Sequence, residues 1–592
     1  MKTGTQKLKI LVHSIGALFL LTAMRGFAGQ APKSGSGAKP SAPHANASAA
    51  KPTSSAKSGP AAKSSLQRQL AEQQREISKL TAIVEQLRQQ VKAEEQAQDN
   101  SQTAASALPT AGTDASLTPV LSRKVRPNSN PAIPLPIATP AASNPVSGAN
   151  SGDVPDSPLQ FHLGSAYFTP VGFMDITGVW RNHDVGSGIG TNFGGIPYGD
   201  TASTNLSEYR MSMQNSRVGF RVDALTHGAH IMGYMEADFL GIVPSPTNLA
   251  VSSNSNPLRS RLYWLDIRKG DWEFLGGQTW SLATPGRTGI SPLPGDIFFS
   301  QDMDTNYQAG LVWGRIPELR FVVHPSKTLA FAIAADSPDQ YAGGSAGGGL
   351  ITPPSALTSM ENELDGGGTT GWAANTNSPN VAPDLIAKLA FDPSHKFHIE
   401  VGGIERNFKL WNPSTATTYT ATGGGGFVNL NFQLFKGMRI LTNNYVSDGG
   451  GRYIFGQAPD LIIKADGSPS LIHASSTVTG LEYTHRNSLW YAYYGGINVG
   501  RNWGTDSSGK TFGYGYPGSA SSQNRTIQEA TFGLNQALWH NPSYGAVNFI
   551  SQYSYLTRDP WSVATGSPAN AKVNMVFFDI RYSLPGAPPA LK

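Results

Sequence analysis

The residues of this sequence best suited to act on charged or polar solutes are the charged side chains within one interrupted strand. Residues 276–310 begin as a strand-like segment, break into Pro, Gly and Asp, and resume a strand pattern near Gln308. The interruption carries one arginine and three aspartates: Arg287, Asp296, Asp302 and Asp304. Fixed charges of opposite sign that face each other across a narrow water-filled passage create a transverse field, which orients and selects polar solutes. This segment is therefore the first candidate for a selectivity site.

A second set of charges lies in strand-like segments along the chain. In RVGFRVDA, residues 217–224, the two arginines and the aspartate alternate with valine and phenylalanine, so the charged residues share one face of the predicted strand. Further strand-like segments carry arginines that we expect to line the same passage. The wall candidates are Arg217, Arg221, Arg261, Arg268, Arg315, Arg320 and Arg439. The alternative for each is a side chain that is only solvated or locally paired, since exposed ion pairs contribute little.

No catalytic or metal-binding constellation stands out. The sequence has no GxSxG elbow, HExxH pair or phosphate-binding P-loop. It also has no cysteine, which excludes disulfides and thiolate ligands. His395 and His398 are close, but they surround a predicted turn, where solvated residues are expected. The glycine runs at 423–427 and 448–452 are interpreted as loop glycine. We predict no catalytic residue, no metal and no cofactor.

Alternating short and long connections indicate the elements that position these charges. From about Gln160 onward, seven connections are short and turn-like, and they lie near residues 226, 269, 325, 392, 436, 486 and 540. Eight are long and rich in Gly, Asn, Ser and Thr, and they cover 182–207, 242–258, 282–307, 337–383, 412–424, 448–476, 501–525 and 558–571. Their strict alternation predicts sixteen strands. An even number of antiparallel strands with short turns on one side and long loops on the other is typical of outer-membrane barrels.

The predicted fold class is therefore all-β, a 16-stranded antiparallel transmembrane β-barrel over residues 156–592, preceded by a short periplasmic coiled-coil helix. Strand patterns support the barrel. In residues 428–435, Val428, Leu430 and Phe432 alternate with asparagines, as expected for one lipid-facing and one lumen-facing side. The last strand, VNMVFFDIRYSL, resembles the C-terminal assembly signal of bacterial outer-membrane proteins.

The N-terminal residues have a different composition. Residues 1–28 have a basic start, a short apolar run and small residues near Ala28, which predicts a signal peptide; a membrane anchor is the alternative. Residues 29–63 and 99–155 are Ala-, Pro- and Ser-rich linkers. Residues 64–98 carry apolar residues in heptad spacing, which predicts a coiled coil over a lone amphipathic helix and leaves its strand number open.

The charge distribution argues against nucleic acid as a partner. Residues 1–155 hold 17 Lys and Arg against 8 Asp and Glu, and residues 156–592 hold 28 against 32. The basic character thus belongs to the N-terminal segments, and it forms no concentrated basic face of the kind that binds nucleic acid.

Together these features resemble the DcaP-like trimeric porins of bacterial outer membranes. The likeness is carried by AYFTPVGFMDITGVWRN at 166–182, NSRVGFRV at 215–222, WLDIRKGDWEFLGGQTWSL at 264–282 and DTNYQAGLVWGR at 304–315. The resemblance implies a homotrimer with the coiled coil as a trimeric stalk. It also implies passive uptake of small solutes, with anionic compounds such as dicarboxylates as suggested permeants. In general porins the third loop narrows the barrel, and 282–307 is the third long connection here.

The expected function is passive diffusion of small hydrophilic solutes across the bacterial outer membrane, with the N-terminal helix in the periplasm. The expected partners are outer-membrane lipid, copies of the same chain, small permeants and, through the helix, the cell wall. One alternative is a structural protein that tethers the outer membrane to the cell wall through that helix. A barrel hydrolase is the second alternative, although we predict that the protein is not an enzyme.

Overall fold

The computed structural model describes residues 158–241, 256–292, 303–344, 347–355, 382–412 and 415–585. The predicted signal peptide, both linkers and the coiled-coil helix, over residues 1–155, lie outside them. Among the residues described, no helix is long and apolar enough to cross a membrane.

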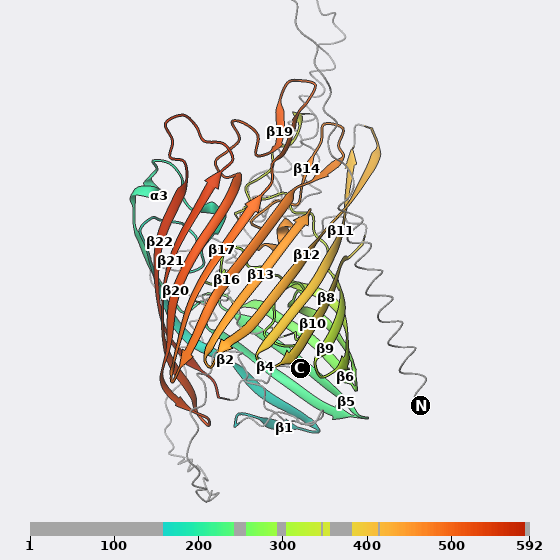
Figure 1. Cartoon of the computed structure of the whole chain (residues 1–592), viewed down its shortest axis with the longest axis vertical. Coiled ribbons are helices and arrows are strands. Elements are labelled where there is room, and N and C mark those ends of the chain that lie inside the picture. The colour runs from blue at the N-terminus through green and yellow to red at the C-terminus, as the bar shows by residue number, and fades with distance from the viewer. Residues whose placement is uncertain are drawn as a thin grey trace, which may run out of the picture. The chain divides into compact units, whose positions relative to one another are not determined.

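Sixteen antiparallel strands form a closed barrel, in which each strand pairs with the next one along the chain (Figure 1). The first eight are β2 (Ala166–Arg181), β4 (Arg217–Thr226), β5 (Ala229–Asp238), β6 (Arg259–Lys269), β7 (Trp272–Trp280), β8 (Arg315–Ser326), β9 (Leu329–Asp336) and β10 (Asp384–Ser394). The other eight are β11 (Phe397–Asn412), β12 (Thr417–Phe435), β13 (Met438–Asp448), β16 (His473–His485), β17 (Ser488–Val499), β20 (Asn524–Asn541), β21 (Gly545–Pro560) and β22 (Ala571–Ser583). The barrel closes where β2 pairs antiparallel with β22. The predicted antiparallel barrel and its strand number are confirmed, whereas the coiled-coil helix of the predicted fold class lies outside the described residues.

Two short strands extend this wall. β1 (Phe161–Leu163) pairs with the beginning of β2, and β3 (Glu208–Ser212) pairs with its end. Because β3 and β4 both pair with β2, they act as one interrupted strand.

All seven short turns lie where the sequence predicts them. The turn between β4 and β5 shows why two residues suffice. His227 and Gly228 have φ values of 50° and 73°, and two successive positive φ angles give a turn whose twist matches that of the flanking strands.

One long connection was predicted wrongly. Residues 412–424 were expected to form a loop, yet β12 begins at Thr417 and pairs with β11 from Asn412 downward. The glycines at 423–426 lie inside β12, between β11 and β13. Glycine is disfavoured in strands by propensity alone, but at 423–425 backbone atoms of the neighbouring strands leave little room for a side chain. A Cβ at Gly424 would lie 2.5 Å from the carbonyl oxygen of Ile404.

The alternation of the strand faces is confirmed. On β4, Val218 and Phe220 are 51% and 40% exposed, whereas Arg221 and Asp223 are 1% and 0% exposed. The exposed face is therefore apolar and the inner face is charged, as a transmembrane barrel requires.

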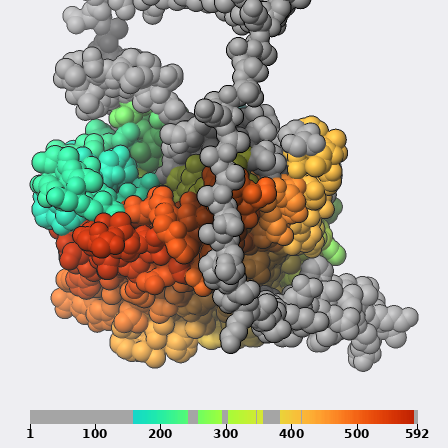
Figure 2. Space-filling model, turned by 90° about the horizontal axis from the view of Figure 1, so that it is seen from above, coloured from blue at the N-terminus to red at the C-terminus, as the bar shows by residue number. Residues whose placement is uncertain are grey.

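The long connections carry small elements of their own. These are η1 (Phe193–Gly195), α3 (Ala202–Asn205), η4 (Gly451–Tyr453), the hairpin β14 (Leu461–Ile463) and β15 (Pro469–Leu471), and the hairpin β18 (Asn502–Thr505) and β19 (Thr511–Tyr514). Figure 2 looks down on the barrel end that carries them, where the red and orange segments of the C-terminal half form one side of the rim. Side chains of η1 and η4, such as Phe193 and Tyr453, are buried, so these connections pack inward.

Candidate pore constriction

The connection between β7 and β8 is folded into the barrel. Most residues of its described parts, 281–292 and 303–314, are buried, with Leu282, Met303 and Val312 at most 1% exposed. Their contacts come from strands far along the chain, including β11, β13, β16 and β20. The third long connection therefore crosses the lumen, as expected from its position in the chain.

Charged side chains of the wall hold the first half of this connection. Arg287 donates two hydrogen bonds of 2.8 Å to the carboxylate of Glu482 on β16. The amide of Gly286 donates to Glu400 on β11 at 3.3 Å, and the amide of Gly289 donates to Asp392 on β10 at 2.9 Å. This half is fastened to three strands through three carboxylates.

Glu400 links this fastening to further charged groups behind it. Its carboxylate lies 3.2 Å from Nζ of Lys388 and 3.4 Å from Nε2 of His398, and it accepts a 2.6 Å hydrogen bond from Asn429. Lys388 in turn donates to the carbonyl oxygen of Thr284 in the connection, at 2.8 Å. One buried network therefore contacts the connection at more than one point.

Aromatic contacts hold the second half. Trp313 stacks on Phe455 with ring centroids 4.5 Å apart, and it packs against Tyr307 at 4.9 Å and Trp280 at 5.6 Å. The backbone also approaches the wall closely at Gly310, which has a φ of 90°. A Cβ there would lie 2.6 Å from a carbonyl oxygen of β16, so only glycine fits.

Most of the predicted wall arginines have acidic or carbonyl partners. Arg221 pairs with Asp223 on its own strand, and Arg261 lies 2.7 Å from Glu236. Arg217 lies farther from Glu236, at 3.8 Å. These wall charges form local ion pairs, the alternative that the sequence left open for each of them.

Two of the other strand arginines, Arg320 and Arg439, also have local partners. Arg320 contacts Glu318 at 2.5 Å and the carbonyl oxygen of Trp280 at 2.7 Å. Arg439 donates to Asn431 at 2.8 Å. Arg268 is half-buried near the end of β6, next to the short turn, and is therefore apart from the connection that crosses the lumen.

Arg315 differs from these arginines. Its guanidinium carbon lies 5.4 Å from the ring centroid of Trp280 and 5.3 Å from that of Trp313, which is the range of cation–π contacts. Among the residues described it has no carboxylate within ion-pair distance, and its Nη1 has no hydrogen-bond partner. Arg315 is therefore a half-buried cation that forms no direct ion pair with a carboxylate of the described residues.

Asp304 was predicted as one of the charges of the selectivity segment, but it does not line a water-filled passage. It is 0% exposed, and its Oδ1 accepts hydrogen bonds from the amides of Thr191 at 3.0 Å and Asn306 at 2.9 Å. Burial raises the pKa of the Asp304 carboxyl, against the opposing effect of these hydrogen bonds and of Arg181. Asp304 therefore ties two connections together. Asp296 and Asp302 lie outside the described residues.

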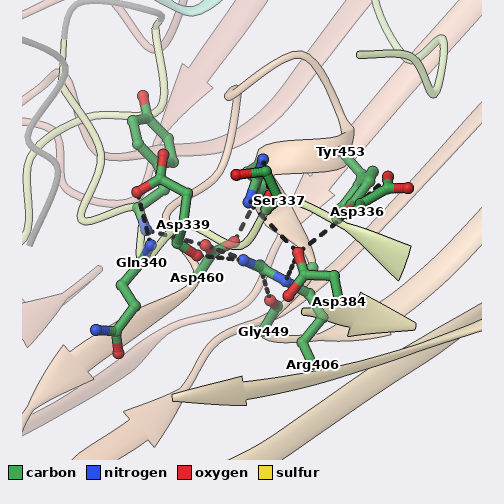
Figure 3. Close-up of polar contacts among 12 residues, drawn as sticks. Asp336, Ser337, Asp339, Gln340, Asp384, Arg406, Gly449, Tyr453 and Asp460 are labelled. Carbon is green, nitrogen blue, oxygen red and sulfur yellow. Dashed lines mark hydrogen bonds and ion pairs between the residues drawn. The ribbon is translucent and has the colours of Figure 1, made fainter. Parts of the chain in front are cut away.

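Sequence reasoning missed a buried network around Arg406 on β11 (Figure 3). Its Nε lies 3.0 Å from Asp384, and its Nη1 lies 2.8 Å from Asp460 in the connection between β13 and β16. Tyr453 donates to Asp384 at 3.0 Å and to Asp336 at 3.2 Å. Burial raises the pKa of Asp460, and the Arg406 charge opposes that rise. The network fastens a second connection inside the barrel.

A signal for Arg406 was present in the sequence. His398 was expected to be solvated beside a turn, but it is buried, as is Glu400 two residues on. Continuing this alternation along the strand puts Arg406 on the same inner face. Arg581 on β22 could be found in the same way, and it pairs with Asp175 on β2 at 3.0 Å where the barrel closes.

The inner wall thus offers dense, fixed dipoles and ion pairs. Such groups can orient a polar solute. Within the described part of the chain, no group of three or more His, Asp or Glu side chains is arranged to hold a metal ion.

Comparisons with known proteins bear on the fold. No protein-family model and no curated protein matches the chain. The outer membrane channel DcaP of Acinetobacter baumannii matches with a TM-score of 0.52 and 17% identity, over 72% of this chain and 99% of that chain. An anion-selective porin from Comamonas acidovorans matches with a TM-score of 0.39 and 11% identity, over 71% and 100%. OmpT of Vibrio cholerae matches with a TM-score of 0.39 and 10% identity, over 72% and 99%.

Only the first of these scores is high enough to bear on the architecture. The chain has the fold of the DcaP outer-membrane channel, which confirms at the level of the fold the resemblance predicted from the sequence.

Proposed function

We propose that the protein is an outer-membrane porin through which small hydrophilic solutes diffuse passively. The observation that carries the proposal is the connection 281–314, which crosses the lumen and is held there by Arg287, Glu482 and Glu400. A barrel with an apolar exterior, a charged interior and an inward-folded loop is suited to select solutes.

The filling of the interior suggests a narrow passage. Side chains from the connection 281–314 and from the connection between β13 and β16 pack together in the barrel, as Trp313 does on Phe455. Two inward connections leave less open cross-section than one. We therefore expect a lower conductance than that of a barrel of this size with an empty lumen.

Selectivity is proposed to favour small organic anions such as dicarboxylates. The support is Arg315, which forms no ion pair with a carboxylate among the described residues and lies beside two tryptophan rings that pack on each other. The paired arginines Arg217, Arg221 and Arg261 contribute less, because Glu236 and Asp223 offset them. Arg287 contributes to this site by holding the first half of the connection against the barrel wall.

We also propose a route of export, a location and an oligomeric state for the chain. The chain is exported by the signal peptide of residues 1–28, inserted in the bacterial outer membrane, and assembled as a homotrimer through residues 64–98 in the periplasm. The support is the heptad spacing and the export signal in the sequence.

Reconstitution into planar bilayers tests the function. The full mature chain should give discrete conductance steps, and the reversal potential in a potassium chloride gradient should indicate anion preference. Liposome swelling should be faster with a dicarboxylate than with a sugar of similar size. A chain without residues 29–155 should still conduct. Absence of conductance from folded protein would exclude the porin function, and cation preference would exclude the proposed selectivity.

A further inference from the structure

A shallow groove of about 830 Å³ crosses the outer face of the barrel wall from β11 to β20. Six of its lining residues are direct partners on successive strands: Val401, Val428, Asn444, Thr477, Gly496 and Gln528. They lie on the outside, since Val401 and Val428 are 46% and 42% exposed while their neighbours Glu400 and Asn429 are 1% exposed. The volume is within the range of ligand pockets.

Two outward glycines create the hollow. A Cβ at Gly496 would have its nearest neighbour at 3.9 Å, and a Cβ at Gly426 would have its nearest neighbour at 3.6 Å. Side chains would therefore fit at both positions without disturbing the strands. Their absence leaves a gap in a wall that is otherwise covered by large side chains.

The groove climbs along the barrel. Val401 lies four residues from Phe397, at the short-turn end of β11, and Gln528 lies thirteen residues from Asn541, at the short-turn end of β20. Short turns of transmembrane barrels face the periplasm. The β20 end of the groove is therefore the higher end, toward the extracellular side.

Polarity rises along the same path. The low end is lined by valines, and in the middle Thr477 donates to Asn444 at 2.9 Å. At the high end Gln528 accepts a 2.6 Å hydrogen bond from Tyr494. Its amide nitrogen, and the whole amide of Asn498, have no hydrogen bond among the described residues.

The rest of the outward face offers a contrast. Exposed positions on β4 and on β6 to β9 are large and apolar, and they include Val218, Phe220, Leu265, Phe274, Leu319, Phe321, Phe331 and Ile333. An amide that faces hydrocarbon without a hydrogen-bond partner is costly. A polar group bound at the high end of the groove would give these two amides the hydrogen-bond partners that hydrocarbon does not offer.

We propose that this groove binds a glycolipid of the outer leaflet, with one acyl chain along the glycine floor and its amide or ester linkage at Asn498 and Gln528. A lipid of that leaflet has its polar part high and its hydrocarbon low, as the groove does. The proposal rests on the outer-membrane location argued above, but it does not depend on conduction.

Charges at the rim fit a phosphorylated sugar headgroup. Arg501 and Arg525 are both exposed and lie within three residues of Asn498 and Thr526. Arg525 has only a loose contact, 3.9 Å, with Asp559. One further carboxylate, Asp448, is bound to His473 at 3.0 Å. Cations without close acidic partners attract phosphate.

Filling the groove tests the proposal. Gly496→Leu places a side chain on its floor, and Gly426→Leu is a second variant in case the first does not fold. Gly233→Leu is the matched control: this glycine on β5 also has its nearest neighbour 3.9 Å from a Cβ, but it lies outside the groove. Lipid that remains bound to each protein, purified from outer membranes in mild detergent, is identified and counted by native mass spectrometry.

The wild type and Gly233→Leu should retain glycolipid, and the two groove variants should retain about tenfold less, the loss expected from about two fewer buried methylene groups. Equal retention in all four proteins, or retention of phospholipid alone, would overturn the proposal. So would loss of oligomers in the groove variants only, because the groove would then be a protein interface. Conductance of the same samples tests the porin function separately.

Discussion

The two halves of the connection 281–314 are held inside the barrel by different physics. Residues 281–292 are fastened by charged groups, above all the pair Arg287–Glu482 and the carboxylate of Glu400. Residues 303–314 are fastened by packed rings, with Trp313 on Phe455 at their centre. The connection thus has an ionic half, residues 281–292, and an aromatic half, residues 303–314.

The two kinds of contact have different consequences for the position of the connection. Ion pairs near water weaken with salt and with protonation of a partner, whereas packed rings depend mainly on excluded volume and buried area. We infer that the aromatic half fixes where the connection lies, and that the ionic half sets how far its edge projects into the passage.

The largest expected effect comes from breaking the aromatic half. Trp313→Ala removes a 5% exposed ring from a cluster of four aromatic side chains, and such truncations cost about 3–5 kcal/mol. The folded barrel should then unfold at lower urea concentration in detergent micelles. Trp503→Ala, at a 43% exposed ring, is the control. Equal midpoints for the two variants would contradict the idea of an anchor.

Breaking the ionic half should change dynamics more than stability. Arg287→Gln leaves Glu482 without its bidentate partner, at a local cost of about 2 kcal/mol. Single-channel records should become noisier as the edge moves, while the urea midpoint changes less than in Trp313→Ala. Arg287→Gln with Glu482→Gln should be quieter than Arg287→Gln alone, because no carboxylate is left unpaired. Quiet records from all three would show that this half does not move.

Selectivity should depend on unpaired charge. Arg315→Gln removes a cation with no acidic partner among the described residues, so the reversal potential in a salt gradient should shift toward cations. Arg221→Gln should shift it less, since Asp223 already offsets that arginine at 2.7 Å. The opposite order would remove Arg315 from the selectivity site.

The smallest effect is expected at Asp304. Its raised pKa means that the folded state favours the protonated carboxyl, so this contribution to stability is present below the unfolded pKa and is lost as the pH rises through the folded pKa. Asp304→Asn keeps an oxygen acceptor for Thr191 and Asn306 and removes the titration. Its urea midpoint should vary less with pH than that of the wild type. An unchanged pH dependence would assign that dependence to other groups.

The fold was largely predictable because two-residue periodicity and turn chemistry are local. Short turns such as His227–Gly228 and the alternation around Phe220 and Arg221 can be recognised without knowledge of the neighbouring strands. The error at 412–424 has a physical reason. Glycine is a common loop residue, and only the closeness of β11 and β13 explains why Gly424 and its neighbours belong to a strand.

The candidate site was less predictable because its pairings are not local. The sequence identified Arg287 but not its partner Glu482, which is 195 residues away. It placed Asp304 among the charges of the selectivity segment, although Asp304 is buried and bonded to Thr191, more than a hundred positions away. Alternation can place a charge on the inner face, as for Arg406, but it does not show which connection that charge holds.

Modification of a single cysteine in the connection tests most directly whether it is the filter of a diffusion channel. The chain has no cysteine, so Thr288→Cys, at an exposed position beside Arg287, carries the only thiol. Thr328→Cys, in the short turn between β8 and β9, is the control. A bulky water-soluble thiol reagent should lower the single-channel conductance of Thr288→Cys and leave that of Thr328→Cys unchanged. An unchanged current through fully modified Thr288→Cys would contradict the account.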